Sequence, residues 1–183
     1  QYVKWAVRNR IPEENVFNNG VLSVSGMLGP LGDLKSALDR RVGYDEDVLV
    51  MASDTLIFGF DNTVYDLNHF VHGYQGLGRI LVYEGDKSTL SRHGIVEIGS
   101  RDAIIGFEEK PSVPKSNLVN ASVQLYTCAM IGAIRQHVFE PRAESGMLIA
   151  YLYPSFPIKI ERAHSRLDIG TVEDVLNANV RRE

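Results

Sequence analysis

Hydrophobic residues along this chain recur with two spacings, one typical of helices and one typical of strands. After Asp33, which is suited to be an N-cap, apolar side chains return every three or four positions up to Arg41 and predict a helix. Residues 47–53 follow as a run that is apolar on both faces, as in a parallel strand buried between two layers of helices. Because the two patterns alternate, the chain is predicted to have an α/β fold.

The same patterns predict further strands and helices downstream. The expected strands are residues 79–84, 94–98, 119–125 and 157–161, and the expected helices are residues 67–71 after an N-cap at Asp66, 130–139 and 171–180. In the strand 119–125 apolar and polar side chains alternate, so we expect one buried and one polar face. Thr171 and Asp174 have the spacing of a capping box. No internal repeat or low-complexity linker is present, so we expect a single domain over residues 1–183.

Composition narrows the classes of partner. The net charge is −4 and no run of Lys or Arg occurs, which disfavours a nucleic-acid partner. Cys128 is the single cysteine, so an internal disulfide and a cysteine-based zinc cluster are excluded. No apolar stretch approaches the ~20 residues that cross a bilayer, and the first residues lack the apolar core of a signal peptide. We therefore expect no membrane partner and a cytoplasmic protein.

Two aspartates follow predicted strands. Asp54 comes directly after the strand predicted to be the most buried, and Asp168 lies just before the predicted C-terminal helix. In α/β sheets ligands collect outside the carboxyl ends of strands, and a carboxylate there can hold Mg²⁺ together with substrate phosphates. The alternative is structural, since aspartate also starts turns and favours helix N-termini. If the two carboxylates converge, they can neutralise a phosphoryl-transfer transition state.

The stretch IIGFEEKPSVPKSN, residues 104–117, ends an apolar run in two carboxylates and an ammonium. Lys110 is a compact cation suited to a phosphate, and Glu109 is an acceptor suited to the hydroxyls of a sugar. Asn120, on the polar face of the next strand, offers both a donor and an acceptor. Local chemistry alone favours a solvated rim over a binding site. Strand alternation places Glu108 on the face opposite Glu109.

Several motifs in this order resemble those of the sugar-1-phosphate nucleotidyltransferases, such as glucose-1-phosphate thymidylyltransferases. The motifs are Leu28-Gly-Pro-Leu-Gly-Asp33, Val48-Leu-Val-Met-Ala-Ser-Asp54, Gly94-Ile-Val-Glu-Ile98, Gly106-Phe-Glu-Glu-Lys-Pro111, Lys115-Ser-Asn-Leu-Val-Asn120 and Leu167-Asp-Ile-Gly-Thr171. The resemblance runs over nearly the whole chain. It implies a Rossmann-like, three-layer domain with a mostly parallel mixed sheet. It also implies transfer of a nucleotidyl group from an NTP to a sugar 1-phosphate, with release of pyrophosphate.

The resemblance also implies a role for each position that matches a family motif. The implied roles are Mg²⁺ binding for Asp54 and Asp168, contact with the sugar phosphate for Lys110, contact with sugar hydroxyls for Glu109 and Asn120, backbone contact with the sugar for Gly94, and contact with the base for Gly29. Positioning and charge neutralisation carry such a reaction, with no covalent intermediate needed.

The chain departs from the family in several places. Nothing matches the family's Gly-Gly-x-Gly-Thr-Arg loop, which grips the NTP phosphates, so the first βα unit is expected to be absent. Pro30 stands where a small residue is usual, Ser53 where glycine is common and Arg166 where an aromatic residue is frequent. Without the first unit, neighbouring strands would expose open edges. We therefore expect either a missing N-terminal segment or a partner chain, such as a second copy in a homo-oligomer.

Two other functions are compatible with these departures. A regulatory or sugar-phosphate-binding relative could keep the sugar pocket without catalysing a reaction. A transferase could also act on a small phosphorylated alcohol, such as choline phosphate, in place of a sugar phosphate. Within residues 104–117, the resemblance shifts the preference from a solvated rim to a site, with Glu109 as the binding carboxylate and Glu108 as a structural one.

Overall fold

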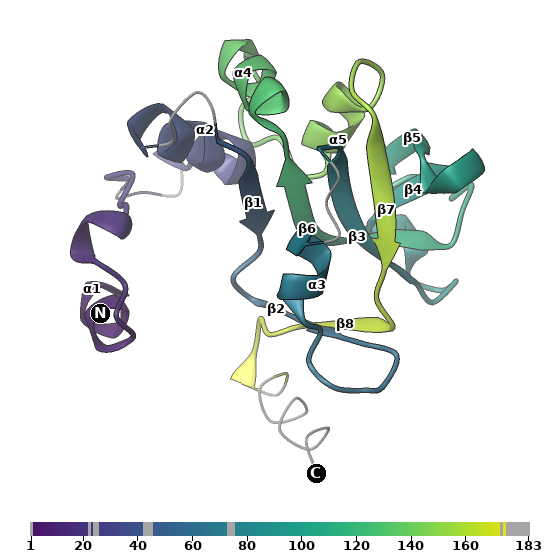
Figure 1. Cartoon of the computed structure of the whole chain (residues 1–183), viewed down its shortest axis with the longest axis horizontal. Helices are drawn as coiled ribbons and strands as arrows, with labels where there is room; N and C mark the ends of the chain where they lie inside the picture. The colour runs from purple at the N-terminus through teal and green to yellow at the C-terminus, as the bar shows by residue number, and fades with distance from the viewer. Residues whose placement is uncertain are drawn as a thin grey trace.

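The computed structural model describes residues 2–21, 23, 26–41, 46–72, 76–172 and 174 (Figure 1). The helices are α1 (Tyr2–Arg8), α2 (Gly29–Arg41), α3 (Leu67–His72), α4 (Cys128–Gln136) and α5 (Met147–Leu152). The strands are β1 (Val48–Met51), β2 (Thr55–Phe58), β3 (Gly78–Glu84), β4 (Gly94–Ile98), β5 (Ile104–Glu109), β6 (Leu118–Tyr126), β7 (Ile158–Arg162) and β8 (Ser165–Asp168). Helices and strands are interspersed along the chain, and the predicted α/β class is confirmed.

The main sheet is mixed, with the strand order β5-β4-β6-β3-β7 and β1 added to β6 beside β4. Only β3 and β7 pair in parallel among the described strands, and the other pairings in this sheet are antiparallel. The mixed sheet is as predicted, but the expected predominance of parallel pairing is not observed. The long strand β6 explains the difference, because β1, β3 and β4 all pair antiparallel with it.

The strand β1 is more exposed than its sequence predicts. Three of its residues are half-buried and Met51 is 47% exposed, although the run is apolar on both faces. Within the described part of the chain β1 pairs with β6 alone, so its other edge has no strand beside it. The predicted burial of residues 47–53 is therefore wrong for this structure, because a buried strand needs neighbours on both edges.

Two apolar clusters on opposite faces of the sheet give the molecule three layers. One cluster joins α2, α4 and α5 to the sheet through side chains such as Leu38, Ile131 and Ile149. The other joins Phe70 of α3 and Ile57 of β2 to the opposite face. The small sheet of β2 and β8 lies on this second side, below the main sheet in Figure 1. This layering places the ends of β1 and β8 next to each other.

The polar residues of β6 are buried, which corrects the prediction of an exposed polar face. Asn120 is 5% exposed and Gln124 is 2% exposed. The Tyr126 hydroxyl donates to the Gln124 Oε1 at 2.7 Å, and the Gln124 Nε2 donates to the Asn120 Oδ1 at 3.4 Å. Each polar group thus has a partner inside the protein, as burial requires. Ser122 interrupts the strand with φ of 60°, a left-handed conformation that costs energy in a residue other than glycine.

Of the three predicted helix N-terminal caps, those at Asp66 and Thr171 are observed and the one at Asp33 is not. The Asp66 Oδ1 accepts from the backbone N–H of Asn68 at 2.9 Å, so Asp66 caps α3 as predicted. Thr171 and Asp174 form the predicted capping box, while the rest of that helix lies outside the described residues. Asp33 is not an N-cap, because α2 already begins at Gly29; its carboxylate instead accepts from Asn19. None of the described helices is long and apolar enough to cross a membrane.

Candidate functional site

The end of β5 carries Glu109 and Lys110 toward a turn. Glu109 lies opposite Gly94 in the register of β4 and β5, and the Lys110 backbone N–H donates to the His93 carbonyl at 3.0 Å. Lys110 has φ of 48°, so the chain leaves the strand direction at this residue. Its exposed ammonium forms an ion pair with Glu144, which raises the pKa of Lys110. The ammonium is accessible to a ligand, because exposed pairs of this kind are weak.

The Glu109 carboxylate packs against two glycines. A Cβ on Gly146 would lie 2.1 Å from the Glu109 Oε2, and a Cβ on Gly94 would lie 3.0 Å from the same atom. Neither position could carry a side chain without moving Glu109 or the neighbouring Phe107 ring. Burial raises the pKa of Glu109, although the charge of Lys110 opposes this effect. The two glycines therefore leave room for the half-buried Glu109 carboxylate. This role of Gly94 is not evident from its sequence motif.

Glu108 lies apart from this arrangement, on the other face of β5. Its Oε1 accepts from the Lys115 Nζ in an exposed ion pair. The same Lys115 ammonium lies 3.9 Å from Glu97. The two adjacent carboxylates thus have different surroundings, in the way that strand alternation predicts.

Asp54 and Asp168 come together although they are far apart in the sequence. The strands β2 and β8 pair antiparallel with Thr55 opposite Asp168, and the Ile169 N–H donates to the Asp54 carbonyl at 2.6 Å. The Asp54 side chain is exposed. The Thr55 hydroxyl donates to the Asp168 Oδ1 at 3.2 Å. The structure therefore brings the backbone of Asp54, just before β2, next to the end of β8, where Asp168 lies.

The Arg166 guanidinium binds both oxygens of the Asp168 carboxylate. Its Nε donates to Oδ1 at 2.9 Å and its Nη2 donates to Oδ2 at 2.5 Å, a bidentate pair. Its Nη1 donates to the Asn120 carbonyl at 3.2 Å and to the Ser122 hydroxyl at 3.4 Å. Partial burial would raise the pKa of Asp168, but the hydrogen bonds and charge of Arg166 hold this pKa below its ordinary value. Asp168 is therefore already neutralised by a residue of its own strand.

The arrangement of donors does not fit a divalent ion bound by both aspartates. Oδ1 of Asp168 already accepts from both Arg166 and Thr55, and Oδ2 accepts from Arg166. The positive charge of Arg166 beside this carboxylate also opposes the approach of a divalent cation. Within the described ranges, no group of three His, Cys, Asp or Glu side chains could hold a metal ion. Asp54 is thus the one predicted ligand whose exposed carboxylate is not engaged by Arg166.

His93 is a further titratable residue of this region. Burial lowers the pKa of His93, and the charges of Arg166 and Lys110 lower it further, while Asp168 raises it. The Lys110 N–H donates to the His93 carbonyl at 3.0 Å, so His93 adjoins the Lys110 end of the site. The sequence does not predict His93 and Glu144 as site residues, because neither belongs to a recognisable motif. Arg166 was noticed only as a departure from the family's pattern.

A cavity of about 230 Å³ lies between the end of β1, the middle of β6 and the start of α2. Its polar lining comes from Ser122, Gln124 and Ser145, and the rest of its lining is largely apolar. Ser145 lies between Glu144, which pairs with Lys110, and Gly146, which contacts Glu109. Ser145 is therefore the lining residue that adjoins the Glu109 and Lys110 end of the site in the sequence.

Asn120 and Gly29 differ from the roles expected of them. The Asn120 side-chain oxygen accepts from the Ser122 N–H at 3.1 Å inside the protein, so a ligand would meet a largely committed carboxamide. Gly29 starts α2 with φ of 78°, and a Cβ there would lie 2.6 Å from the Arg142 Cα. The conformation and this close approach both require glycine at the position. Gly29 lines a separate hollow with Asn19 and Asp33.

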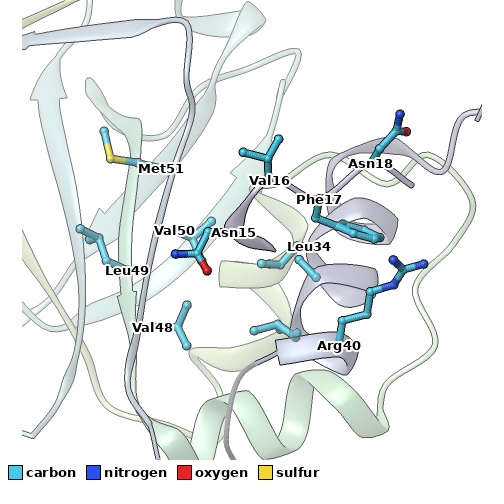
Figure 2. A pocket seen from close by; sticks show the side chains of 12 residues that line it. Asn15, Val16, Phe17, Asn18, Leu34, Arg40, Val48, Leu49, Val50 and Met51 are labelled. Carbon is cyan, nitrogen blue, oxygen red and sulfur yellow. The ribbon is translucent and has the colours of Figure 1, made fainter. Parts of the chain in front are cut away.

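A larger groove of about 700 Å³ runs along β1 (Figure 2). One wall is β1 itself, and the other is formed by α2 and residues 15–18. The Arg40 guanidinium lies 3.8 Å from the centre of the Phe17 ring on that second wall. Val48 and Val50 lie on the side of β1 that faces α2, whereas Leu49 and Met51 lie on its other side, as strand alternation requires (Figure 2).

Comparison with known proteins identifies similar chains. The family described as nucleotidyl transferase matches residues 33–183. A glucose-1-phosphate thymidylyltransferase of Streptomyces antibioticus is 31% identical over 108 residues, which cover 58% of this chain and 29% of that protein. A mannose-1-phosphate guanylyltransferase catalytic subunit beta of Danio rerio is 30% identical over 158 residues, which cover 81% of this chain and 40% of that protein.

The fold is also similar to that of solved structures. An apo UDP-glucose pyrophosphorylase superposes with a TM-score of 0.70 at 18% identity, covering 86% of this chain and 62% of the other. At this identity the likeness shows the fold alone. The chain spans 29% and 40% of the length of the two curated relatives, so the relatives contain much more sequence than it does.

Proposed function

Because this chain belongs to the nucleotidyl transferase family, we propose that it forms part of the catalytic domain of a sugar-phosphate nucleotidyltransferase. The full-length protein would transfer a nucleotidyl group from an NTP to a sugar 1-phosphate and release pyrophosphate. The names of the two curated relatives, a thymidylyltransferase and a guanylyltransferase acting on sugar 1-phosphates, support the class of reaction. They differ in both base and sugar, so the proposal names neither.

One observation carries the proposal, namely that the end of β5 holds the Glu109 carboxylate against Gly94 and Gly146 and places the exposed Lys110 ammonium directly after it in the chain. The end of this strand therefore presents a fixed carboxylate and an exposed ammonium. Such convergence of complementary charges is what binding a phosphorylated sugar requires. Lys110 would exchange its weak pair with Glu144 for the sugar phosphate, and Glu109 would accept from sugar hydroxyls. Asn120 and Gly94 would line the sugar, and Gly29 would lie near the base.

In the proposed reaction, an oxygen of the sugar phosphate attacks the α-phosphorus of the NTP. The new P–O bond forms as the bond to the β-phosphate oxygen breaks, and pyrophosphate leaves with the bonding electrons. The contribution of this chain is to orient the attacking phosphate and to balance its charge through Lys110. Glu109 would fix the sugar ring, because its carboxylate is held against Gly94 and Gly146.

Mg²⁺ stays a proposal for the full-length protein, with Asp54 and Asp168 as its predicted ligands. When bound, a divalent ion supplies charge neutralisation to the transferred phosphoryl group. The arrangement of Arg166 and Asp168 does not fit such an ion as it stands, so no step above depends on it. The cytoplasmic location and the homo-oligomer also stay predictions.

The second candidate is a non-catalytic relative that binds a sugar phosphate. The pairing of Arg166 with Asp168 favours it, because this pairing engages a carboxylate that the catalytic reading assigns to a metal. Such a protein would keep the Glu109 and Lys110 end of the site and bind hexose phosphate without turnover.

The test is to incubate the full-length protein with each NTP and a set of hexose 1-phosphates in the presence of Mg²⁺. We expect pyrophosphate release that depends on both substrates, with a nucleotide-sugar product identified by mass spectrometry, and loss of both in Asp54→Ala. Unchanged turnover in Asp54→Ala would refute the role of that carboxylate. Binding of a hexose phosphate without pyrophosphate release would support the non-catalytic relative, and turnover with choline phosphate alone would replace the sugar by a phosphorylated alcohol.

A further inference from the structure

The Arg166 guanidinium lies beside Asp168, where the predicted metal ion would bind, and carries a positive charge itself. Its guanidinium engages both oxygens of Asp168, at 2.9 Å and 2.5 Å, and its third nitrogen is anchored on β6 through the Asn120 carbonyl. The anchoring matters because β6 is the central strand, paired on both sides, and does not move independently of the sheet. We propose that Arg166 is a built-in cation of this site that competes with a divalent metal ion for Asp168.

Exposure of the two partners supports this assignment. The Arg166 side chain is 13% exposed, whereas the Asp168 side chain is 51% exposed. The guanidinium therefore lies on the inner side of the carboxylate, between Asp168 and β6, rather than reaching over it from solvent. An arginine in this position loses little further conformational freedom on pairing, and its planar fork matches a carboxylate bidentately.

The remaining partner of Asp168 belongs to the same arrangement. The Thr55 hydroxyl donates to Oδ1, the oxygen that also accepts from the Arg166 Nε. A metal ion bound to Oδ1 would have to displace one of these donors, and a metal ion bound to Oδ2 would lie beside the positive charge of Arg166. Asp54, whose exposed carboxylate comes directly before β2, would then be the chief protein ligand, and one carboxylate alone holds a divalent ion weakly.

The inference deepens the proposed site but concerns metal binding and not turnover, so it can fail or hold independently of the proposed reaction. The experiment is a calorimetric titration of Mn²⁺ into the full-length protein without nucleotide or sugar. Four proteins are compared: the unmodified protein, Asp168→Asn, Arg166→Met and the double variant. Circular dichroism establishes that each is folded.

If pairing with Arg166 keeps Asp168 from binding the metal ion, the single substitution Asp168→Asn changes the Mn²⁺ affinity less than about twofold, because the Asp168 carboxylate does not bind the ion in the unmodified protein. Arg166→Met removes a competing charge and frees a second carboxylate beside Asp54, so the Mn²⁺ affinity rises about tenfold or more. The double variant loses this gain.

The opposite results overturn the inference. A tenfold loss of Mn²⁺ affinity in Asp168→Asn alone would mean that Asp168 already binds the ion beside Arg166. An unchanged affinity in folded Arg166→Met would mean that the two cations do not compete. If Arg166→Met does not fold, the comparison between the unmodified protein and Asp168→Asn decides the question by itself.

Discussion

The two ends of the candidate site use their carboxylates in opposite ways. At the end of β5, Glu109 is half-buried between glycines and burial raises its pKa, while the nearby Lys110 ammonium stays exposed. At the end of β8, Asp168 is half-exposed and its pKa is lowered by the bidentate pair with Arg166. At the first end both members of the ion pair between Lys110 and Glu144 are exposed, whereas at the second end the partner of Asp168 is the largely buried Arg166. A ligand would therefore displace the first pair more easily than the second. Ligand recognition is therefore expected to depend chiefly on the Glu109 and Lys110 end.

The largest effect is expected from removing the exposed ammonium. In the full-length protein, Lys110→Met should lower kcat/KM for pyrophosphate release about 100-fold, because a charge aimed at the reacting phosphate is lost. Lys115→Met is the matched control, since Lys115 also forms an exposed pair with a glutamate, in its case Glu108 on the other face of β5. It should stay within about twofold of the unmodified protein. Equal losses in both variants would contradict the comparison.

A smaller effect is expected from a substitution that displaces the Glu109 carboxylate but keeps this residue as glutamate. Gly146→Ala places a Cβ 2.1 Å from the Glu109 Oε2, so the carboxylate must shift and the KM for the sugar phosphate should rise about tenfold. Gly132→Ala, in α4, is the control because its Cβ would meet nothing within 4 Å. It should leave KM unchanged and raise helix stability slightly. Steady-state kinetics on both variants, with sugar phosphate varied, measure the difference; an unchanged KM in Gly146→Ala would refute the positioning role.

The smallest effect concerns stability and pH. The pKa of Glu109 is raised in the folded state, so the folded protein binds this proton more tightly than the unfolded chain does. The contribution of Glu109 to the free energy of unfolding is therefore fully present at acid pH and is lost as the pH rises through the folded pKa. Glu109→Gln should therefore raise Tm at pH 7. Asp168 has a lowered folded pKa, and its contribution is present at neutral pH and lost on acidification. Asp168→Asn should lower Tm at pH 7.

Both shifts in Tm are expected to be about 1–3 °C, and both should shrink at pH 3, where the carboxyls are largely protonated in the unfolded state. Thermal unfolding followed by circular dichroism at the two pH values measures them. Shifts of the same sign at pH 7 would show that the two carboxylates do not differ in the way described.

Much of the fold follows from local patterns in the sequence. The predicted strand 94–98 coincides with β4, and the N-cap at Asp66 and the capping box at Thr171 are observed. The family resemblance, drawn from short motifs, is confirmed by the match over residues 33–183. These features succeed because they depend on neighbouring residues and on hydrophobic periodicity, which the sequence displays directly.

Features that depend on tertiary packing were not predictable in the same way. The polar face of β6 is buried because Gln124 finds partners in Tyr126 and Asn120, which alternation alone cannot reveal. Asp33 lies within α2 because the helix starts at Gly29, where a positive φ and the Arg142 backbone fix the chain. The bidentate grip of Arg166 depends on the pairing of β8 with β2 and on its proximity to β6.

The most direct test of the account is whether the two adjacent carboxylates of β5 differ in binding a sugar phosphate. Glucose 1-phosphate is titrated by calorimetry into the full-length protein and into Glu109→Gln and Glu108→Gln, without NTP. The account predicts that Glu109→Gln weakens binding about tenfold, since hydrogen bonds to a charged acceptor are lost, whereas Glu108→Gln leaves Kd unchanged. Equal affinities in the two variants, or a loss confined to Glu108→Gln, would contradict it.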